Sequence, residues 1–227
     1  MSTNGSPRYR LVCFDLDGTL VDDTIYIWQT LHDHFGSDAA RRRQAREDFF
    51  EGRIPYDAWL AHDMELLIAR GANHERLREA VGRLKPMEGA HDTLATLSAR
   101  GARLAVLSGS LDVVLEHHFP GTPFAHVFLN RLRFAPDGAI AGWEATPYDL
   151  ARKAQGLLEM ARRENLPLRR IAFVGDNEND LEVVRLLKSQ GGLAVAFNCK
   201  SAALAREASV VVPGRDLRAV LPYLLQD

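Results

Sequence analysis

Residues 10–20 read R-L-V-C-F-D-L-D-G-T-L, and this stretch decides the fold. Its first five residues form a short apolar run rich in β-formers, which is typical of a buried parallel strand. The run ends abruptly in an acidic turn that contains a glycine. Ligands of doubly wound sheets bind outside the carboxyl ends of the strands. We therefore expect Asp15 and Asp17 to lie in a functional site, although the stretch alone also fits a turn that only caps a helix.

Helical periodicity replaces this β pattern between Asp22 and Lys85. Glycine and proline punctuate the block, and it contains no convincing strand. The helices that we predict there are Ile25–Phe35, Ala39–Phe50, Tyr56–Arg70 and His74–Leu84. An all-helical block directly after the first strand predicts a cap that is inserted into another domain.

Strands and helices alternate after Pro86. The predicted strands are Arg103–Leu107, Val127–Phe134, Ala139–Trp143, Ile171–Val174, Ala194–Phe197 and Val210–Val212. The predicted helices are Ala90–Arg100, Asp112–Phe119, Leu150–Glu164, Leu181–Leu187, Ser201–Glu207 and Leu217–Leu225. Turn residues at 136–138 make the second and third of these strands a small β-hairpin. The alternation predicts the α/β class, with a doubly wound, Rossmann-like parallel sheet covered by helices on both faces.

These patterns divide the chain into two predicted domains. Residues 1–22 and 86–227 form the α/β core, and residues 23–85 form the inserted α-helical cap. A length of 227 residues suits one large domain or one domain with an insertion. The basic run at 41–43 lies in a predicted cap helix, where we interpret it as a solvated helix face rather than a binding patch.

The composition excludes several classes of protein. Hydrophobic residues make up 46% of the chain and charged residues 26%, which is ordinary for a protein with a packed core. A net charge of -2 argues against nucleic acid as a partner, because binding its phosphates needs a basic excess. No segment has the roughly 20 apolar residues of a membrane span, and residues 1–10 do not resemble a signal peptide. We interpret Cys13 and Cys199 as buried thiols of a cytoplasmic protein.

Two further loops follow predicted strands and bring complementary chemistry. Residues 108–110, S-G-S, offer hydroxyl and backbone donors that suit a phosphate oxygen. Residues 175–180, G-D-N-E-N-D, add two aspartates, which together with Asp15 suffice for a magnesium site of oxygen ligands. Lys153, near the start of a predicted helix, can balance the negative charge at the same edge of the sheet. Each segment alone could be an ordinary turn or a solvent-facing residue, but their order and placement together make that interpretation improbable.

The four segments together resemble the signature motifs of the haloacid dehalogenase-like superfamily. The matching residues are D-L-D-G-T-L at 15–20, Ser108, Lys153 and G-D-N-E-N-D at 175–180. The resemblance covers nearly the whole chain and is closest to the phosphoserine-phosphatase-like branch. That branch has a helical cap after its first motif, an Asn-Arg-Leu segment like residues 130–132, and a strand and turn like residues 196–201. The resemblance implies a cytoplasmic, magnesium-dependent phosphatase.

The resemblance also implies a role for each candidate residue. Asp15 would be the nucleophile, and Asp17 would protonate the leaving group and then activate water. Accordingly, the predicted catalytic residues are Asp15, Asp17, Ser108 and Lys153, the phosphate-binding residues Gly18, Ser108, Gly109, Lys153 and Asn179, and the magnesium ligands Asp15, Asp17, Asp176 and Asp180. The chemistry agrees, since phosphoryl transfer depends on positioning and charge stabilisation, and a covalent step divides the hydrolysis into two displacements.

The predicted cap departs from that branch at the residues that bind the amino acid. The branch typically has a glutamate and an arginine where an ungapped comparison finds Thr24 and Asp63, and only a small gap would bring Arg53 or Arg70 into place. An aspartate would repel a substrate carboxylate. We therefore expect another small phosphorylated metabolite, with phosphoserine as the second choice. The predicted specificity residues are Trp28, Trp59, His62 and Asp63, and packing within the cap is the alternative for the two tryptophans.

Other functions fit less of the sequence. A phosphotransferase shares the first half-reaction and differs only in its acceptor. A receiver domain needs neither Asp17 nor a cap, and a dehalogenase does not need the metal-binding aspartates. A non-catalytic binding protein would not keep every catalytic position. The sequence leaves the oligomeric state open between a monomer and a homodimer.

Overall fold

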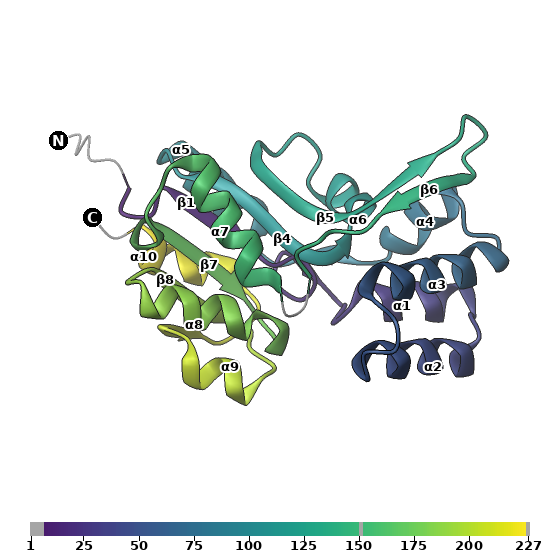
Figure 1. The fold of residues 1–227 in the computed structure, drawn as a ribbon. Coiled ribbons are helices and arrows are strands. Elements are labelled where there is room, and N and C mark those ends of the chain that lie inside the picture. The colour runs from purple at the N-terminus through teal and green to yellow at the C-terminus, as the bar shows by residue number, and fades with distance from the viewer. Residues whose placement is uncertain (1–6, 150–151, 226–227) are drawn as a thin grey trace.

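The computed structural model describes residues 7–149 and 152–225, which contain a seven-stranded sheet in the order β6-β5-β4-β1-β7-β8-β9 (Figure 1). The strands are β1 (Leu11–Phe14), β4 (Arg103–Leu111), β5 (Phe124–Phe134), β6 (Ile140–Glu144), β7 (Ile171–Gly175), β8 (Leu193–Phe197) and β9 (Val210–Val212). All neighbours pair in parallel except β6, which runs antiparallel to β5 at one edge. The predicted α/β fold is confirmed, and so is its hairpin, whose first strand also belongs to the main sheet.

Helices cover both faces of this sheet. They are α5 (Ala90–Ala99), α6 (Asp112–His118), α7 (Lys153–Glu164), α8 (Leu181–Ser189), α9 (Ala202–Glu207) and α10 (Leu221–Leu224). Leu11 and Cys13 of β1 share a core cluster with α7, α8 and α9, whereas Val12 and Phe14 share the opposite cluster with α5, α6 and α10. All four side chains are fully buried. A central strand covered on both faces explains why these residues form a continuous apolar run.

Most of the predicted helices are present with limits that differ by one to three residues, and two differ in other ways. The predicted start of α7 at Leu150 and Ala151 lies outside the described residues, and the helix runs from Lys153. The predicted C-terminal helix is a 3-10 turn, Leu217–Val220, followed by α10. Pro222 lies in the first turn of α10, where its missing N–H is tolerated. None of the described helices is long and apolar enough to cross a membrane.

A helical block lies beyond one end of the sheet, between β2 (Val21–Asp22) and β3 (Lys85–Pro86) (Figure 1). Its helices are α1 (Ile27–Phe35), α2 (Ala39–Phe50), α3 (Tyr56–Ala69) and α4 (His74–Val81). The short strands β2 and β3 pair antiparallel with each other. The chain therefore enters and leaves the helical block at one place. The division into domains at residues 22 and 86 stays a prediction.

Candidate active site

Three predicted segments meet at the carboxyl ends of β4, β1 and β7, which are neighbours in the sheet. Their buried polar residues include Asp15, Asp17, Ser108, Ser110, Asp176 and Asp180. Residues 108–110 are not a loop after the strand, as we expected, but an irregular part of β4. The pairing of β4 with β5 shifts between Leu107 and Leu111, so the intervening residues leave the regular ladder. This bulge frees their backbone groups at the edge of the sheet.

Lys153, the first residue of α7, is fully buried and bridges two carboxylates. Its Nζ donates to Asp15 Oδ1 at 2.7 Å and to Asp180 Oδ1 at 2.8 Å. Burial alone would lower the lysine pKa, but the two carboxylates raise it above its ordinary value. Lys153 is therefore a fixed positive charge against the Asp15 carboxylate.

Both oxygens of the Asp180 carboxylate are bonded to protein groups. Oδ1 accepts from Lys153, and Oδ2 accepts from the backbone N–H groups of Asp176 and Asn177 at 3.0 and 3.3 Å. Burial raises the pKa of Asp180 even though the Lys153 charge opposes this shift. Asp180 thus orients Lys153 and the loop that follows β7, whereas Asp15 and Asp176 line the cavity.

The acidic cluster fits a hard metal ion. Carboxylate oxygens of Asp15, Asp176 and Asp180 lie within 4.8 Å of one another, and Mg²⁺ prefers such oxygen ligands. Burial, and next the charge of Asp15, raises the pKa of Asp176, so a cation between the two would stabilise both carboxylates. In the described part of the chain, the buried Oδ1 of Asn179 has no hydrogen-bond partner, which leaves it for a bound ion or its water. The Lys200 ammonium pairs with Asp176, so this carboxylate already attracts a cation.

Gly18 is the residue that brings the backbone close to this cluster. It has a φ of 75°, a left-handed conformation that side chains rarely adopt. A Cβ at this position would overlap the Asp176 carboxylate and the end of the Lys200 side chain. The sequence D-L-D-G at 15–18 therefore needs glycine for both conformation and space.

The Asp17 carboxylate lies between the helical block and the sheet. Its Oδ2 accepts from the backbone N–H of Ile27 at 2.7 Å, and its Oδ1 accepts from Ser110 Oγ at 2.8 Å. Burial, and next the charge of Asp15, raises the Asp17 pKa to about 7 in spite of these two donors. A carboxyl with this pKa can both give and take a proton near neutral pH.

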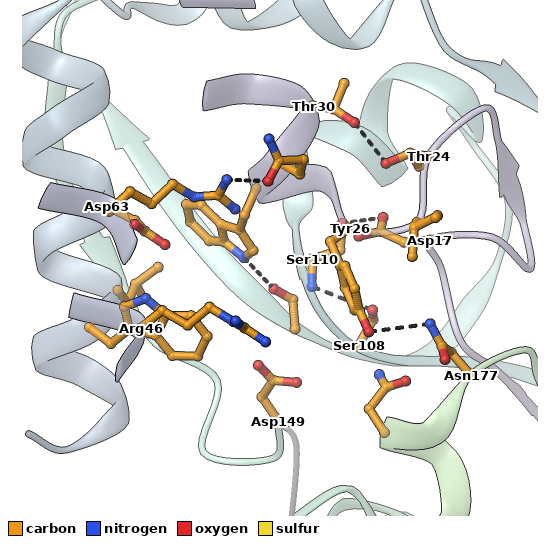
Figure 2. A pocket seen from close by; sticks show the side chains of 18 of the residues that line it. Asp17, Thr24, Tyr26, Thr30, Arg46, Asp63, Ser108, Ser110, Asp149 and Asn177 are labelled. Atoms are coloured by element: carbon orange, nitrogen blue, oxygen red, sulfur yellow. Dashed lines mark hydrogen bonds between the residues drawn. The ribbon is translucent and has the colours of Figure 1, made fainter. Parts of the chain in front are cut away.

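A cavity of about 750 Å³ opens above these residues and extends under the helical block (Figure 2). Trp28 of α1 reaches across it, and its Nε1 donates to the Gly109 carbonyl oxygen at 3.0 Å. Asn130 Nδ2 donates to the same carbonyl at 2.7 Å and to the Tyr56 hydroxyl of α3 at 2.9 Å. These contacts join the helical block to the 108–110 segment, so the cavity is covered.

The four predicted specificity residues have different places. Trp28, Trp59 and Asp63 line the cavity, whereas His62 is not among the residues that line it. Trp59 also stacks on Phe49 within the helical block, with ring centroids 4.6 Å apart. The buried Asp63 faces His32, with 3.3 Å between the carboxylate Oδ1 and Nε2. Trp59 thus packs within the helical block and also forms part of the cavity wall, and its role in substrate specificity stays a prediction.

Several residues at the site were missed by sequence reasoning. Ser110 was named only with its loop, and Asn130 and Lys200 only as parts of a resemblance. The only feature of the sequence that pointed to Ser110 was its hydroxyl in the S-G-S segment at 108–110. Arg42 and Arg43 line the cavity, and Arg41 does not. Arg41 and Arg43 are exposed, in agreement with the interpretation of the basic run as a solvated helix face, whereas Arg42 is half-buried.

A parallel sheet with aspartates at the ends of two adjacent strands, a buried lysine and a helical insertion defines a class of α/β hydrolases. The family model for haloacid dehalogenase-like hydrolases matches residues 12–185, and the chain belongs to this family. This agrees with the resemblance drawn from the four motifs.

The relatives with similar sequences include several phosphoserine phosphatases. The phosphoserine phosphatase of Methanocaldococcus jannaschii is 29% identical over 222 residues, which cover 96% of this chain and 98% of that protein. The human enzyme is 26% identical over 174 residues, 75% of each chain. A solved phosphoserine phosphatase with a phospho-aspartyl intermediate analogue has a TM-score of 0.72 at 26% identity, covering 95% of this chain and 99% of its own. The similarity to this branch therefore extends over the helical block as well as the sheet.

Proposed function

We propose that this chain is a magnesium-dependent phosphatase that hydrolyses a small phosphomonoester through a phosphoryl group carried on Asp15. The observation that carries this proposal is the Asp15 carboxylate itself. One of its oxygens is held by Lys153 at 2.7 Å, and the residue lines the cavity beside Asp176 and Asp17. A carboxylate fixed in this way is oriented to attack phosphorus in line with the leaving oxygen.

The reaction has two displacements. In the first, an Asp15 oxygen bonds to phosphorus and the ester oxygen leaves, taking a proton from Asp17. In the second, Asp17 takes a proton from water, which attacks phosphorus and releases inorganic phosphate and Asp15. The raised pKa of Asp17 suits a group that must carry a proton in one step and accept one in the next.

The proposed phosphate site is built from donors around Asp15. Ser108 Oγ and the backbone N–H of Gly109 would bind phosphate oxygens, together with Lys153 and Asn179. Gly18 would contribute to this site through its position, because its lack of a Cβ leaves room for the Asp176 carboxylate and the Lys200 ammonium beside the acidic cluster. Preorganised donors of this kind stabilise the charge that develops in the transition state.

Magnesium would be held by the carboxylates of Asp15 and Asp176 and by the backbone carbonyl of Asp17. When bound, the ion supplies positive charge that offsets the negative charge of the transferring phosphoryl group. Asp180, whose oxygens already bind Lys153 and the backbone, would support these ligands from behind. Asn179 would bind the ion's water or a phosphate oxygen through its unpartnered Oδ1.

The helical block of residues 23–85 would act as a cap that closes over the substrate. The hydrogen bonds of Trp28 to Gly109 and of Ile27 to Asp17 support a closed arrangement. A closed cap excludes folded phosphoproteins and favours small metabolites. The cytoplasmic location and the choice between monomer and homodimer stay predictions.

Phosphoserine is the second candidate substrate, and the relatives favour it. Against it stand Thr24, whose hydroxyl is bonded to Thr30 at 2.9 Å, and the buried carboxylate of Asp63. Neither residue offers the carboxylate and arginine that would bind the two charges of an amino acid. We therefore favour another phosphomonoester, with a phosphotransferase reaction as the alternative outcome for the same aspartyl-phosphate.

The test is an assay of phosphate release from a panel of phosphorylated metabolites, including phosphoserine and 4-nitrophenyl phosphate. Turnover that requires magnesium and is lost in Asp15→Asn is the expected result. Phosphoserine as the best substrate would refute the argument from Thr24 and Asp63. If no ester were hydrolysed in water but an added alcohol became phosphorylated, the enzyme would be a phosphotransferase.

A further inference from the structure

Asn130 of β5 is a fully buried asparagine whose side chain uses both its donor and its acceptor atom. Its Nδ2 donates to the Gly109 carbonyl oxygen at 2.7 Å and to the Tyr56 hydroxyl at 2.9 Å, and its Oδ1 accepts from the backbone N–H of Thr146 at 2.8 Å. A carbonyl oxygen only accepts and a backbone N–H only donates, so these two partners fix the orientation of the amide group. The Asn130 side chain is therefore held in one position by three separate segments of the chain.

Asn130 lies opposite the irregular part of β4. The pairing of β4 with β5 is regular up to Leu107, and after the shift Leu111 pairs with Asn130. Two side chains donate to the Gly109 carbonyl between these points, Asn130 from the sheet and Trp28 from α1, whose Nε1 lies 3.0 Å away. A carbonyl oxygen has two lone pairs, so these two donors saturate it.

Gly109 is the residue of the 108–110 segment that most needs such restraint. A Cβ at position 109 would overlap the Asp149 carboxylate, so the site requires glycine there. Glycine has the widest choice of backbone conformations, and the peptide group that follows it can rotate easily. A rotation would displace Ser110, whose hydroxyl binds Asp17, together with the neighbouring donors that we assign to phosphate. The two bonds to the Gly109 carbonyl oppose that rotation.

The bond to Tyr56 connects this segment to the helical block. Tyr56 is the first residue of α3 and lies 74 positions before Asn130 in the sequence. Because one Nδ2 group donates to both Tyr56 and Gly109, a movement of α3 away from the sheet would bend or break one of the two bonds. Asn130 itself is not among the residues that line the cavity, so it acts on the site through Gly109.

We propose that Asn130 is a positioning residue, which holds the 108–110 segment in the conformation that binds phosphate and, through Tyr56, makes this conformation depend on the place of the helical block. The inference rests on the proposed phosphatase function and adds a residue that touches neither substrate nor metal. Preorganised donors act most strongly on the charge that develops in the transition state, so a shift of this segment would cost more there than in substrate binding. A substrate that draws the helical block into place would thereby also complete the phosphate site.

The test uses Asn130→Ala, Tyr56→Phe and the double variant, with Asn73→Ala as the matched control. The Asn73 side chain caps α4 of the helical block by accepting from the backbone N–H of Arg76 at 2.9 Å. Its loss therefore destabilises the same block without removing a contact to the site. Tyr56→Phe keeps the ring and removes only the hydroxyl, so it tests the inference even if Asn130→Ala fails to fold.

Two quantities are measured in each variant. The first is phosphate release from an alkyl phosphate and from 4-nitrophenyl phosphate, with kcat and KM determined separately. The second is hydrogen exchange of the backbone amides of residues 108–110, which does not depend on turnover. The double variant separates the bond between Asn130 and Tyr56 from the other interactions of the Tyr56 hydroxyl, which include Asp149.

We expect Tyr56→Phe to lower kcat/KM about three- to tenfold and Asn130→Ala about 10- to 100-fold, for both esters and mainly through kcat. Both variants should speed exchange at residues 108–110, whereas Asn73→Ala should change neither quantity. In the Asn130→Ala background, Tyr56→Phe should cost less than about twofold, because its connection to the segment is already lost.

Three results would overturn the inference while leaving the phosphatase intact. They are wild-type values of both quantities in Tyr56→Phe, unchanged exchange at residues 108–110 in Asn130→Ala, and an equal loss from Tyr56→Phe with and without Asn130. An Asn73→Ala variant as impaired as Tyr56→Phe would likewise show a merely structural role. If wild type released no phosphate from either ester, the proposed function would itself fail, and the inference with it.

Discussion

Replacing Ser110 with alanine should selectively impair proton transfer from Asp17 to the leaving group. Ser110 Oγ donates to Asp17 Oδ1 at 2.8 Å, and both residues are buried, so water replaces the lost donor poorly. A hydrogen bond to a charged group contributes about 1.5–3 kcal/mol. The backbone N–H of Ile27 still binds the other oxygen, so we expect the lower part of this range. At 1.36 kcal/mol per pKa unit, the loss corresponds to about one pH unit.

The direction of this change follows from the hydrogen bond. Ser110 stabilises the ionised form of Asp17, so its removal raises the Asp17 pKa further above its ordinary value. Asp17 must be protonated to protonate a leaving alkoxide. For an alkyl phosphate, kcat/KM therefore falls as the pH rises through this pKa, and in Ser110→Ala the fall should move about one pH unit upward. Looser positioning of Asp17 should also lower the plateau roughly tenfold.

The assay is a profile of kcat/KM against pH in saturating magnesium, for an alkyl phosphate and for 4-nitrophenyl phosphate. The nitrophenolate leaving group needs no proton, so its first step should change little in the variant. An alkyl profile that kept both its position and its height would refute the reasoning. Equal losses for the two esters would indicate damage to the phosphate site and not to proton transfer.

Three further changes test other parts of the structure. Lys153→Met leaves two buried carboxylates without their cation, so denaturant titration should show a loss of about 3–5 kcal/mol in unfolding free energy, together with loss of turnover; unchanged stability would contradict the buried bridge. Gly18→Ala forces a side chain into a left-handed conformation at a cost of about 1–3 kcal/mol, and its Tm should no longer rise on addition of magnesium. Cys13 is fully buried, which raises the pKa of its thiol, whereas Cys199 is half-buried. A thiol reagent should therefore modify one cysteine in the native protein and two after denaturation. Rapid modification of both cysteines in the native protein would contradict the burial of Cys13.

The sheet and the acidic cluster could be predicted because their signals are local. The run at 10–14 is apolar without interruption because β1 is covered on both faces, and the acidic turn follows it directly. Parallel strands bring their carboxyl ends to one edge, so the order of the segments was enough to expect Asp15 near residues 176–180. The position of Lys153 near the start of a helix likewise indicated that it could balance the negative charge at this edge, whereas its contacts with both Asp15 and Asp180 depend on the tertiary fold.

The cavity side of the helical block could not be predicted in the same way. Helix α2 has charged residues around most of its circumference, so its sequence does not indicate which face is turned inward. Only the packing of α2 against α3 selects Arg42 and Arg46 for the cavity and leaves Arg41 outside. Likewise, the bond between Ser110 and Asp17 joins residues 93 positions apart, and no spacing rule within one segment reveals it.

The antiparallel pairing of β2 with β3 has a consequence for how this architecture is assembled. Val21 lies opposite Pro86, and directly paired residues of antiparallel strands have Cα atoms only about 4.5–5.5 Å apart. The two ends of the helical block are therefore close enough to be joined by a tight turn. Deleting residues 23–84 and closing the gap with two glycines would leave every strand of the main sheet in sequence. A different insertion at the same two positions would therefore keep the strand order of the sheet, and it could give the same aspartates a different substrate if it also covered the core residues that the helical block shares with β1.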